Sequence, residues 1–339
     1  LGLPVEFSKS YGYYQDGLWR LQDEAFVLLG ADRLAFRDFK VESEQHKLPL
    51  LSISGAAGLN EKEKLDISFA DFPVELLGEL IPGGGLEPSG NLSGTLSLYR
   101  LFSEEMPLMT STLRVDDLSM NGMALGKLSV DSRFGAEGKV LEIGALLQKD
   151  GVDLLKISNS KVRPFEPEQL LDIEAKIEGL PLEAIKPFGG DLFKSLSGKA
   201  SGRLLVKGSG DNPQINGALY LTKPQMNLAF LNSPMRLDLK GEPILITSHS
   251  IILPDIRITD SKEGSAHLIG VLFHRNFADL DMRLNLDRIK NFQAMATTVK
   301  DNEQFYGKAV VTSQDLVPKG NGRAVEISGP LNDLYIKAN

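Results

Sequence analysis

The chain has 339 residues, of which 37 are basic and 45 acidic, so its formal charge at pH 7 is −8, and a basic nucleic-acid-binding surface is not expected. The absence of cysteine excludes thiol catalysis, disulfides and zinc sites built from thiolates. Hydrophobic residues (42%) and charged residues (24%) occur in the proportions of a folded protein, which argues against disorder.

The first 70 residues predict a series of short β-strands. Strand-like runs such as Leu18–Leu21 and Leu34–Val41 alternate with turn sequences such as Asp16-Gly17. No signal peptide and no apolar run of transmembrane length is present in the sequence. Because strand-like sequence starts so close to Leu1, we expect the chain to be a segment of a longer protein whose membrane anchors lie outside it.

Residues 71–180 predict one structural unit. The proline turn Phe72-Pro73 follows an alternating strand and leads into the helix-like run Val74–Ile81. A proline and three glycines end this helix. A strand with two Ser-Gly pairs, Ser89–Leu98, comes next, and further strands complete the unit.

The same order of elements recurs 108 residues further along the chain. The pattern Ser-Gly-x-x-Ser-Gly-x-Leu-x-apolar begins at Ser89 and again at Ser197. The preceding turns, Phe72-Pro73-Val74 and Leu180-Pro181-Leu182, have the same offset, and the second turn leads into a helix predicted over 182–196. This period exceeds the roughly 20–50 residues of simple solenoids, so each repeat is expected to combine one helix with many strands.

A weaker third copy is predicted near the end of the chain. The alternating run Leu280–Leu286 leads into a helix-like run, Asp287–Met295, and Gly307 stands near the place of the second glycine. We therefore divide the chain into four parts. They are a β segment (1–70), a first repeat (71–180), a second repeat (181–286) and the start of a third (287–339).

The predicted strands are apolar on one side only. Leu280, Met282 and Leu284 share one face of their strand, and Asp281 and Arg283 share the other. Turn residues interrupt the strands about every eight to twelve positions, which indicates an antiparallel array. The few short helices cannot cover so much sheet. The expected fold class is therefore all-β with a few short helices: an elongated antiparallel β-groove whose apolar interior is covered by its own curvature or by a lipid-like ligand.

The candidate ligand-binding residues are apolar side chains that alternate with polar ones in these strands. They are Ile173, Ala175, Ile177, Leu204, Val206, Ile215, Leu219, Leu221, Met226, Leu228, Phe230, Leu237, Leu239, Ile256, Ile258, Met282, Leu284 and Leu286.

Residues that carry enzyme chemistry do not cluster in this sequence. The four histidines, His46, His249, His267 and His274, are scattered. No nucleophile elbow, P-loop or HExxH motif occurs. The sequence therefore predicts a protein that is not an enzyme, with no catalytic residues, no metal site and no cofactor.

Three segments resemble the TamB family of AsmA-like envelope proteins. The run Asn212-Pro213-Gln214-Ile215-Asn216-Gly217-Ala218-Leu219, four residues after Gly208 and following a Leu-x-Val strand, is similar to the recurring unit of that family. Asn291–Ala309, with its Thr-Thr, Asp-Asn and Phe-Tyr-Gly-x-Ala sequences, resembles the family's C-terminal module, most closely the versions from Bacteroidetes-type bacteria. Ile327-Ser328-Gly329-Pro330-Leu331 resembles the strand and turn that follow it.

This resemblance implies a long periplasmic β-structure, folded like a taco shell, with an apolar groove for phospholipid acyl chains. TamB-like proteins are anchored in the inner membrane, reach the outer membrane and are linked to a BamA-family outer-membrane barrel. They are implicated in phospholipid transport and in outer-membrane protein assembly. The resemblance therefore predicts a segment of a periplasmic lipid bridge, with acyl chains and a BamA-family barrel as partners and no nucleic acid.

Two other functions fit the same pattern. An exposed sheet edge can template the strands of outer-membrane proteins by β-augmentation. Alternatively, the apolar faces pack on each other in closed β-sandwiches, as in a scaffold protein of the cell envelope.

Overall fold

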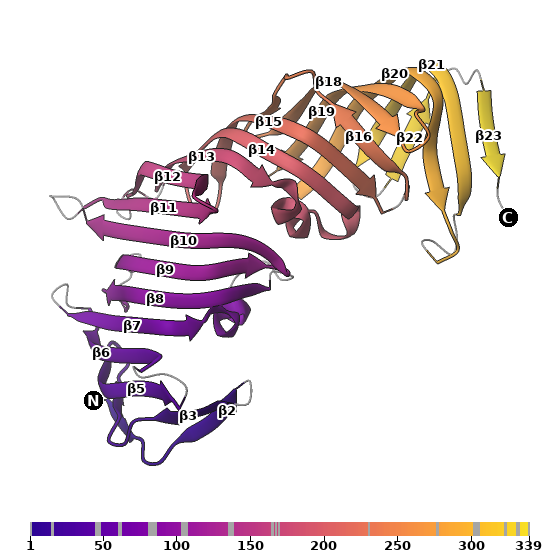
Figure 1. Ribbon diagram of the computed structural model, residues 1–339. Helices are drawn as coiled ribbons and strands as arrows, with labels where there is room; N and C mark the ends of the chain where they lie inside the picture. Colours follow the sequence, from indigo (N-terminus) through magenta and orange to yellow (C-terminus); the bar gives the residue numbers. More distant parts are fainter. Residues whose placement is uncertain are drawn as a thin grey trace. The chain divides into compact units, whose positions relative to one another are not determined.

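The structure is a computed structural model. It describes residues 2–337 except 15–16, 45–48, 60–62, 81–86, 103–107, 135–138, 164–165, 167, 169, 230, 276–277, 301–305, 322–323 and 330–332. The described chain is all-β and its strands pair antiparallel, which confirms the expected fold class (Figure 1). It forms two compact units, which we describe separately. Unit 1 comprises Leu1–Glu174 with Gly208–Gly210, and unit 2 comprises Ala175–Lys207 with Asp211–Asn339.

Unit 1 is a meander in which each strand from β5 to β12 pairs with the next. On its other side, β5 pairs with β4 through its first half and with β3 through its second half. The short strands β1 and β2 add to β4 and β3. The strands are β1 (Leu3–Glu6), β2 (Tyr11–Tyr14), β3 (Gly17–Leu21), β4 (Phe26–Leu29), β5 (Leu34–Ser43), β6 (Leu51–Ala57), β7 (Lys64–Pro73), β8 (Pro88–Tyr99), β9 (Leu108–Met120), β10 (Met123–Phe134), β11 (Leu141–Lys149) and β12 (Val152–Val162).

In unit 2, β16 and β17 follow one another along the chain and both pair with β15 on one side and with β18 on the other. The sheet continues through β19, β20 and β21, and β21 pairs with both β22 and β23. β13 (Leu171–Pro181) crosses the division between the units. The other strands are β14 (Phe193–Gly208), β15 (Pro213–Leu228), β16 (Pro234–Asp238), β17 (Ile244–Ile246), β18 (Ser250–Asp260), β19 (Ser265–Arg275), β20 (Ala278–Thr297), β21 (Gly307–Asn321), β22 (Ala324–Ser328) and β23 (Asp333–Lys337).

Cross-strand pairing separates apolar from polar side chains in unit 1. Residues opposite each other in an antiparallel pair lie on the same face of the sheet. One such row crosses five strands as Phe69, Gly94, Leu113, Val130 and Ala145. The neighbouring row, on the opposite face, consists of Ser68, Thr95, Thr112, Asp131 and Gly144. One face of this sheet is therefore mainly apolar, with Ser111, Ser132 and Ser160 in the row that also contains Leu96 and Ile143, and the other is hydrophilic.

Bulges interrupt the alternation without mixing the two faces. At several bulges one extra residue adopts a left-handed backbone, so consecutive apolar residues of one face lie three positions apart instead of two. Phe69 and Phe72 illustrate this spacing around Asp71, and their rings lie 5.6 Å apart, centroid to centroid. Asp and Asn tolerate this backbone better than other residues with a side chain. Residues of these two types that have φ between 46° and 53° within strands are Asp38, Asp71, Asp117, Asn159 and Asn291.

The sequence repeat has a structural counterpart in a hydrogen bond at the bulge. The backbone N–H of Asp71 donates to Ser93 Oγ over 3.0 Å. At the same offset of 108 residues, the N–H of Gly179 donates to Ser201 Oγ over 2.9 Å. A third such bond joins the N–H of Asn291 to Thr312 Oγ1 at 3.1 Å. The second serine of each Ser-Gly pattern therefore satisfies the N–H group that the bulge removes from the strand ladder.

The predicted helices are only partly present. Short 3₁₀ helices follow the two proline turns, η1 over Val74–Leu80 and η3 over Leu182–Leu192. The helix predicted over 182–196 is therefore too long, because β14 begins at Phe193. The helix predicted over Asp287–Met295 is wrong: these residues belong to β20. Left-handed residues at Arg288 and Asn291 give its apolar side chains a spacing of three, which imitates a helix.

We predict that unit 1 depends on the left-handed backbone of Asp71 (φ 53°). Asp71→Val lowers the free energy of unfolding by about 1–2 kcal/mol, because a β-branched side chain collides with its own backbone in this conformation. Asp71→Gly is the matched control and costs little, because glycine adopts positive φ freely. Trp19, whose ring lies 6.1 Å from that of Phe72, reports urea unfolding by fluorescence. Equal loss of stability in both variants contradicts this account.

Candidate functional site

The apolar face of unit 1 is a broad surface over β7 to β12 whose side chains are mostly half-buried. Leu98 lies opposite Met109, and Met109 keeps 43% of its surface exposed. Ala145 lies opposite Ile157 at the far side of this surface. We call this surface the unit 1 face. Its half-buried or exposed members are Ile67, Phe69, Leu96, Leu98, Met109, Leu113, Leu128, Val130, Ala145 and Ile157.

The sequence prediction placed every candidate binding residue in 173–286 and therefore missed the unit 1 face. Alternation was visible there, as in Leu65, Ile67 and Phe69. The bulges at Asp71 and Asp117 break that alternation and disguise the continuity of the face from strand to strand.

One end of unit 2 is a packed protein core. Buried side chains from β16, β18, β19, β20 and β21 contact each other there. The connection between β15 and β16 is hydrogen-bonded to the end of β20: the N–H of Ala296 donates to the carbonyl of Leu231 over 2.8 Å, and Ser233 Oγ donates to the carbonyl of Gln293 over 2.6 Å. These bonds close this end of the sheet on itself. The buried apolar side chains are Met235, Leu239, Ile256, Ile258, Ala266, Ile289, Phe292, Val311 and Leu316.

Asp260 fixes the closed end. Its side chain is 1% exposed. One carboxylate oxygen accepts from the N–H of Gln293 at 2.5 Å, and the other accepts from the N–H groups of Lys262 at 2.7 Å and Gly264 at 3.0 Å. A buried carboxylate is stable only when it is hydrogen-bonded in this way, so Asp260 ties β20 to the β18–β19 turn.

The other end of the unit 2 strands has the same apolar face but no buried core. Ile246 lies opposite Ile251, and Ile251 lies opposite Leu272. Leu272 in turn lies opposite Met282 on the next strand. A parallel row joins Leu253, Gly270 and Leu284. We call this surface the unit 2 face. Its half-buried members are Leu219, Ile246, Ile251, Leu272, Met282 and Leu284, together with Ile244 and Leu253, which also pack against the closed core.

The predicted binding residues separate into three groups by their environment. Ile177, Leu239, Ile256 and Ile258 are buried at 8% exposure or less, and the last three pack in the closed end of unit 2. Phe230 lies outside the described residues. The half-buried residues are Ile173, Ala175, Leu204, Val206, Ile215, Leu219, Leu221, Met226, Leu228, Leu237, Met282, Leu284 and Leu286.

Within that half-buried group, Leu221, Met226, Leu237 and Leu286 pack against the closed core. Four other members lie nearer the opposite end of the strands, where the unit 2 face is: Leu204, Leu219, Met282 and Leu284. Leu204 lies against Gly217, where an added Cβ would approach its Cδ2 to 2.9 Å.

A charged cluster lies on the opposite, hydrophilic side of unit 2. His267 Nδ1 and Asp255 Oδ1 are 2.8 Å apart, and Lys240 and Arg288 also contact Asp255 at 3.3 Å. The hydrogen bond with His267, helped by the one from Lys240, lowers the pKa of Asp255 to about 2. No hydroxyl group is bonded to this imidazole in the described chain, so the pair lacks the nucleophile of a hydrolytic triad.

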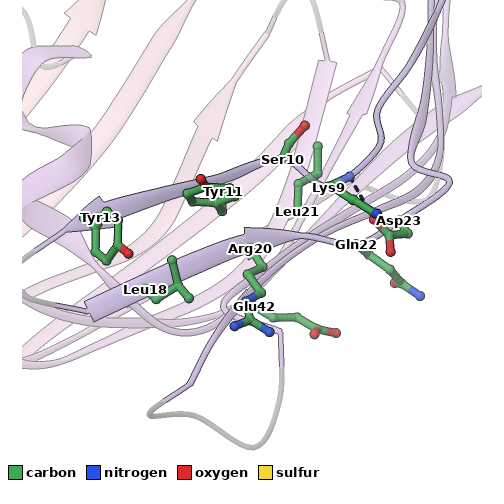
Figure 2. Close-up of a pocket in the computed structure, with 10 residues that line it drawn as sticks. All are labelled: Lys9, Ser10, Tyr11, Tyr13, Leu18, Arg20, Leu21, Gln22, Asp23 and Glu42. Atoms are coloured by element: carbon green, nitrogen blue, oxygen red, sulfur yellow. Dashed lines mark hydrogen bonds between the residues drawn. The ribbon is translucent and has the colours of Figure 1, made fainter.

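The hollow beside the β2–β3 hairpin carries no convergent chemistry. It has a volume of about 700 Å³ and is shown in Figure 2. Tyr11 and Tyr13 stand along β2, at 72% and 76% exposure. Arg20, which also lines the hollow, forms an ion pair with Glu44 over 2.9 Å, and both side chains are 61% exposed. None of these groups is desolvated, as a catalytic or tight ligand site requires.

The described residues contain no group of three His, Asp or Glu side chains placed to hold a metal ion. None of their helices is long and apolar enough to cross a membrane.

The chain matches no protein-family model, no curated protein and no solved structure. The two half-buried apolar faces are thus the strongest candidate site.

We predict that Asp260 is essential to the closed end. Asp260→Ala leaves three N–H groups without their acceptor and lowers the free energy of unfolding by roughly 3 kcal/mol. Asp211→Asn, an exchange at an exposed loop residue, is the control and stays within about 0.5 kcal/mol of wild type. Chemical unfolding followed by circular dichroism measures both variants. If Asp260→Ala unfolds like the control, the carboxylate does not hold this end together.

Proposed function

We propose that this chain is a non-enzymatic segment of a periplasmic TamB/AsmA-like bridge that carries phospholipids between the inner and outer membranes. The acyl chains lie along the unit 1 face and the unit 2 face. The observation that carries this proposal is the half-exposed state of both faces. An apolar surface of this extent is costly in water, and proteins usually reserve such surfaces for a partner.

Acyl chains suit these faces energetically. Each buried methylene contributes about 0.8 kcal/mol, so an acyl chain of about sixteen carbons gains on the order of 10 kcal/mol when it is fully covered. Leu, Ile, Val, Met and Phe make up most of the unit 1 face, and its serines Ser111 and Ser132 are hydrogen-bonded to each other over 2.9 Å. The binding energy is therefore spread evenly, which favours sliding over capture at one point.

The closed end of unit 2 has a different role in this proposal. Leu239, Ile256 and Ile258 are surrounded by protein, so they stabilise the unit and do not bind lipid. In unit 2, lipid contacts residues of the unit 2 face such as Leu219, Met282 and Leu284.

The place of the chain in the cell follows from the resemblance of Asn291–Ala309 to the TamB family. We propose that the parent protein is anchored in the inner membrane and works with a BamA-family barrel of the outer membrane. The lipid-facing rows described above support that assignment, since such a bridge needs apolar side chains along its path.

Aspartate on either apolar face is expected to displace lipid. Leu113→Asp in unit 1 and Leu284→Asp in unit 2 place a charge where an acyl chain lies, and bound phospholipid falls at least tenfold for each variant. Native mass spectrometry of the purified chain measures the bound phospholipid. Thr112→Asp and Asn216→Asp, on the exposed opposite sides, are the matched controls and retain lipid.

Circular dichroism is expected to show similar strand content in all these variants, because Leu113 and Leu284 are only half-buried. Purified wild-type chain without any phospholipid, or face variants that retain as much lipid as the controls, would sink the proposal.

A second candidate function, strand templating, is favoured by the edge strand β2. Within the described residues β2 pairs with β3 alone, so its free side presents unpaired backbone groups for β-augmentation. We predict that Tyr13→Pro, which removes an N–H group, abolishes binding of a synthetic ten-residue peptide with alternating polar and apolar residues. Gly12→Ala is the control, because an added Cβ there meets nothing within 4 Å. Fluorescence anisotropy of the labelled peptide measures this, and failure of wild type to bind excludes templating at β2.

A further inference from the structure

The hydrophilic side of unit 2 is interrupted by a block of apolar side chains on three adjacent strands. Leu245 of β17 lies opposite Ile252 of β18, which lies opposite Val271 of β19. Ile269 and Phe273 flank Val271 on the same face, because residues two apart on a strand share a side. Leu245, Ile269 and Phe273 are 41%, 48% and 37% exposed. We call these five residues the outer patch.

The outer patch has no counterpart in the matching row of unit 1. It lies on the side opposite the unit 2 face, since Ile244 and Ile246 flank Leu245 and point the other way. The hydrophilic row of unit 1 described above consists of Ser68, Thr95, Thr112, Asp131 and Gly144, and none of these residues has a large apolar side chain. An antiparallel sheet with one apolar face is thus formed in unit 1 without such a patch, so the exposed apolar surface of unit 2 calls for a partner.

Cationic side chains border the outer patch. Arg283 lies opposite Val271, and its guanidinium carbon is 5.1 Å from the centre of the Phe273 ring. Arg275 is exposed two residues beyond Phe273. Asp281 lies opposite Phe273. Asp287 lies opposite His267, which shares the side of Ile269 and contacts Asp255. Long cationic side chains with apolar stems, such as those of Arg275 and Arg283, fit the boundary between acyl chains and anionic headgroups.

We propose that the outer patch docks unit 2 on the surface of a bilayer that contains anionic phospholipid. The arginines pair with headgroup phosphates, and Leu245, Ile269 and Phe273 enter the headgroup region. A second copy of the chain fits less well, because a stable protein interface buries about 800 Å² on each partner, more than five partly exposed side chains supply. A bilayer accepts each apolar side chain separately and sets no such minimum. The proposal is independent of lipid carriage, which uses the opposite side of the sheet.

Vesicle co-sedimentation with the full 339-residue chain tests this proposal. Wild type is expected to bind vesicles of phosphatidylglycerol and phosphatidylcholine in equal parts, and to bind pure phosphatidylcholine vesicles at least tenfold more weakly. Arg283→Gln and Arg275→Gln each weaken binding to the anionic vesicles about fivefold, the effect of one cation at a charged membrane surface. The double variant Leu245→Asn with Phe273→Asn weakens it tenfold or more. Thr112→Asn, in the hydrophilic row of unit 1, is the control and binds like wild type.

Three outcomes overturn the proposal: wild type fails to bind anionic vesicles, it binds both vesicle types equally, or the patch variants bind as well as the control. Analytical ultracentrifugation adds a fourth, since a wild-type dimer that Leu245→Asn with Phe273→Asn dissociates assigns the patch to a second copy. The arginine variants keep the test valid if the apolar double variant misfolds. Leu284→Asp is expected to bind vesicles like wild type, so a failure of lipid carriage and a failure of docking remain distinguishable.

Discussion

The structure depends on one constraint: residues opposite each other in antiparallel strands must lie on the same face, strand after strand. In unit 1 this keeps Leu113, Val130 and Ala145 in one row and Thr112 and Asp131 in the row behind them. A shift of one residue in any strand would send its apolar side chains to the hydrophilic side. The faces proposed to bind lipid exist only because this register survives every bulge.

The bulges are where the register is most at risk, and the chain stabilises them in two ways. Asp, Asn or Gly occupies many of the left-handed positions, where other side chains are strained. A hydroxyl group on the next strand accepts the N–H that the ladder no longer uses, as Ser93 does for Asp71 and Ser201 for Gly179. The repeated Ser-Gly pattern is therefore a device for holding register, and it serves the apolar faces indirectly.

Unit 2 uses the same apolar rows for two purposes. At the closed end, the hydrogen bonds that Ala296 donates to Leu231 and that Ser233 donates to Gln293 bring apolar side chains into mutual contact. At the open end, Met282 and Leu284 continue the same face but stay half-buried. Stability is thus concentrated where the sheet closes on itself, and the remaining apolar surface stays free for a partner.

Alternation in the sequence predicts the β class and which side chains share a face, because both are local properties. It fails over Asp287–Met295, where two left-handed residues space the apolar side chains like a helix. Alternation also cannot distinguish a core residue from a half-buried one: Ile256 packs in the core of unit 2, and Leu284 does not. That difference arises from hydrogen bonds between residues far apart in sequence, such as Leu231 and Ala296, and no local pattern encodes it.

The central claim is that lipid lies on one face of the sheet and not on the other. Site-specific photocrosslinking tests it most directly, with p-benzoylphenylalanine placed at Leu113 or at its neighbour Thr112 in bacteria that express the chain in the periplasm. The account predicts phospholipid adducts at Leu113 and none at Thr112, detected by mass spectrometry of the purified protein. Equal adducts at both positions, or adducts at Thr112 alone, would contradict it.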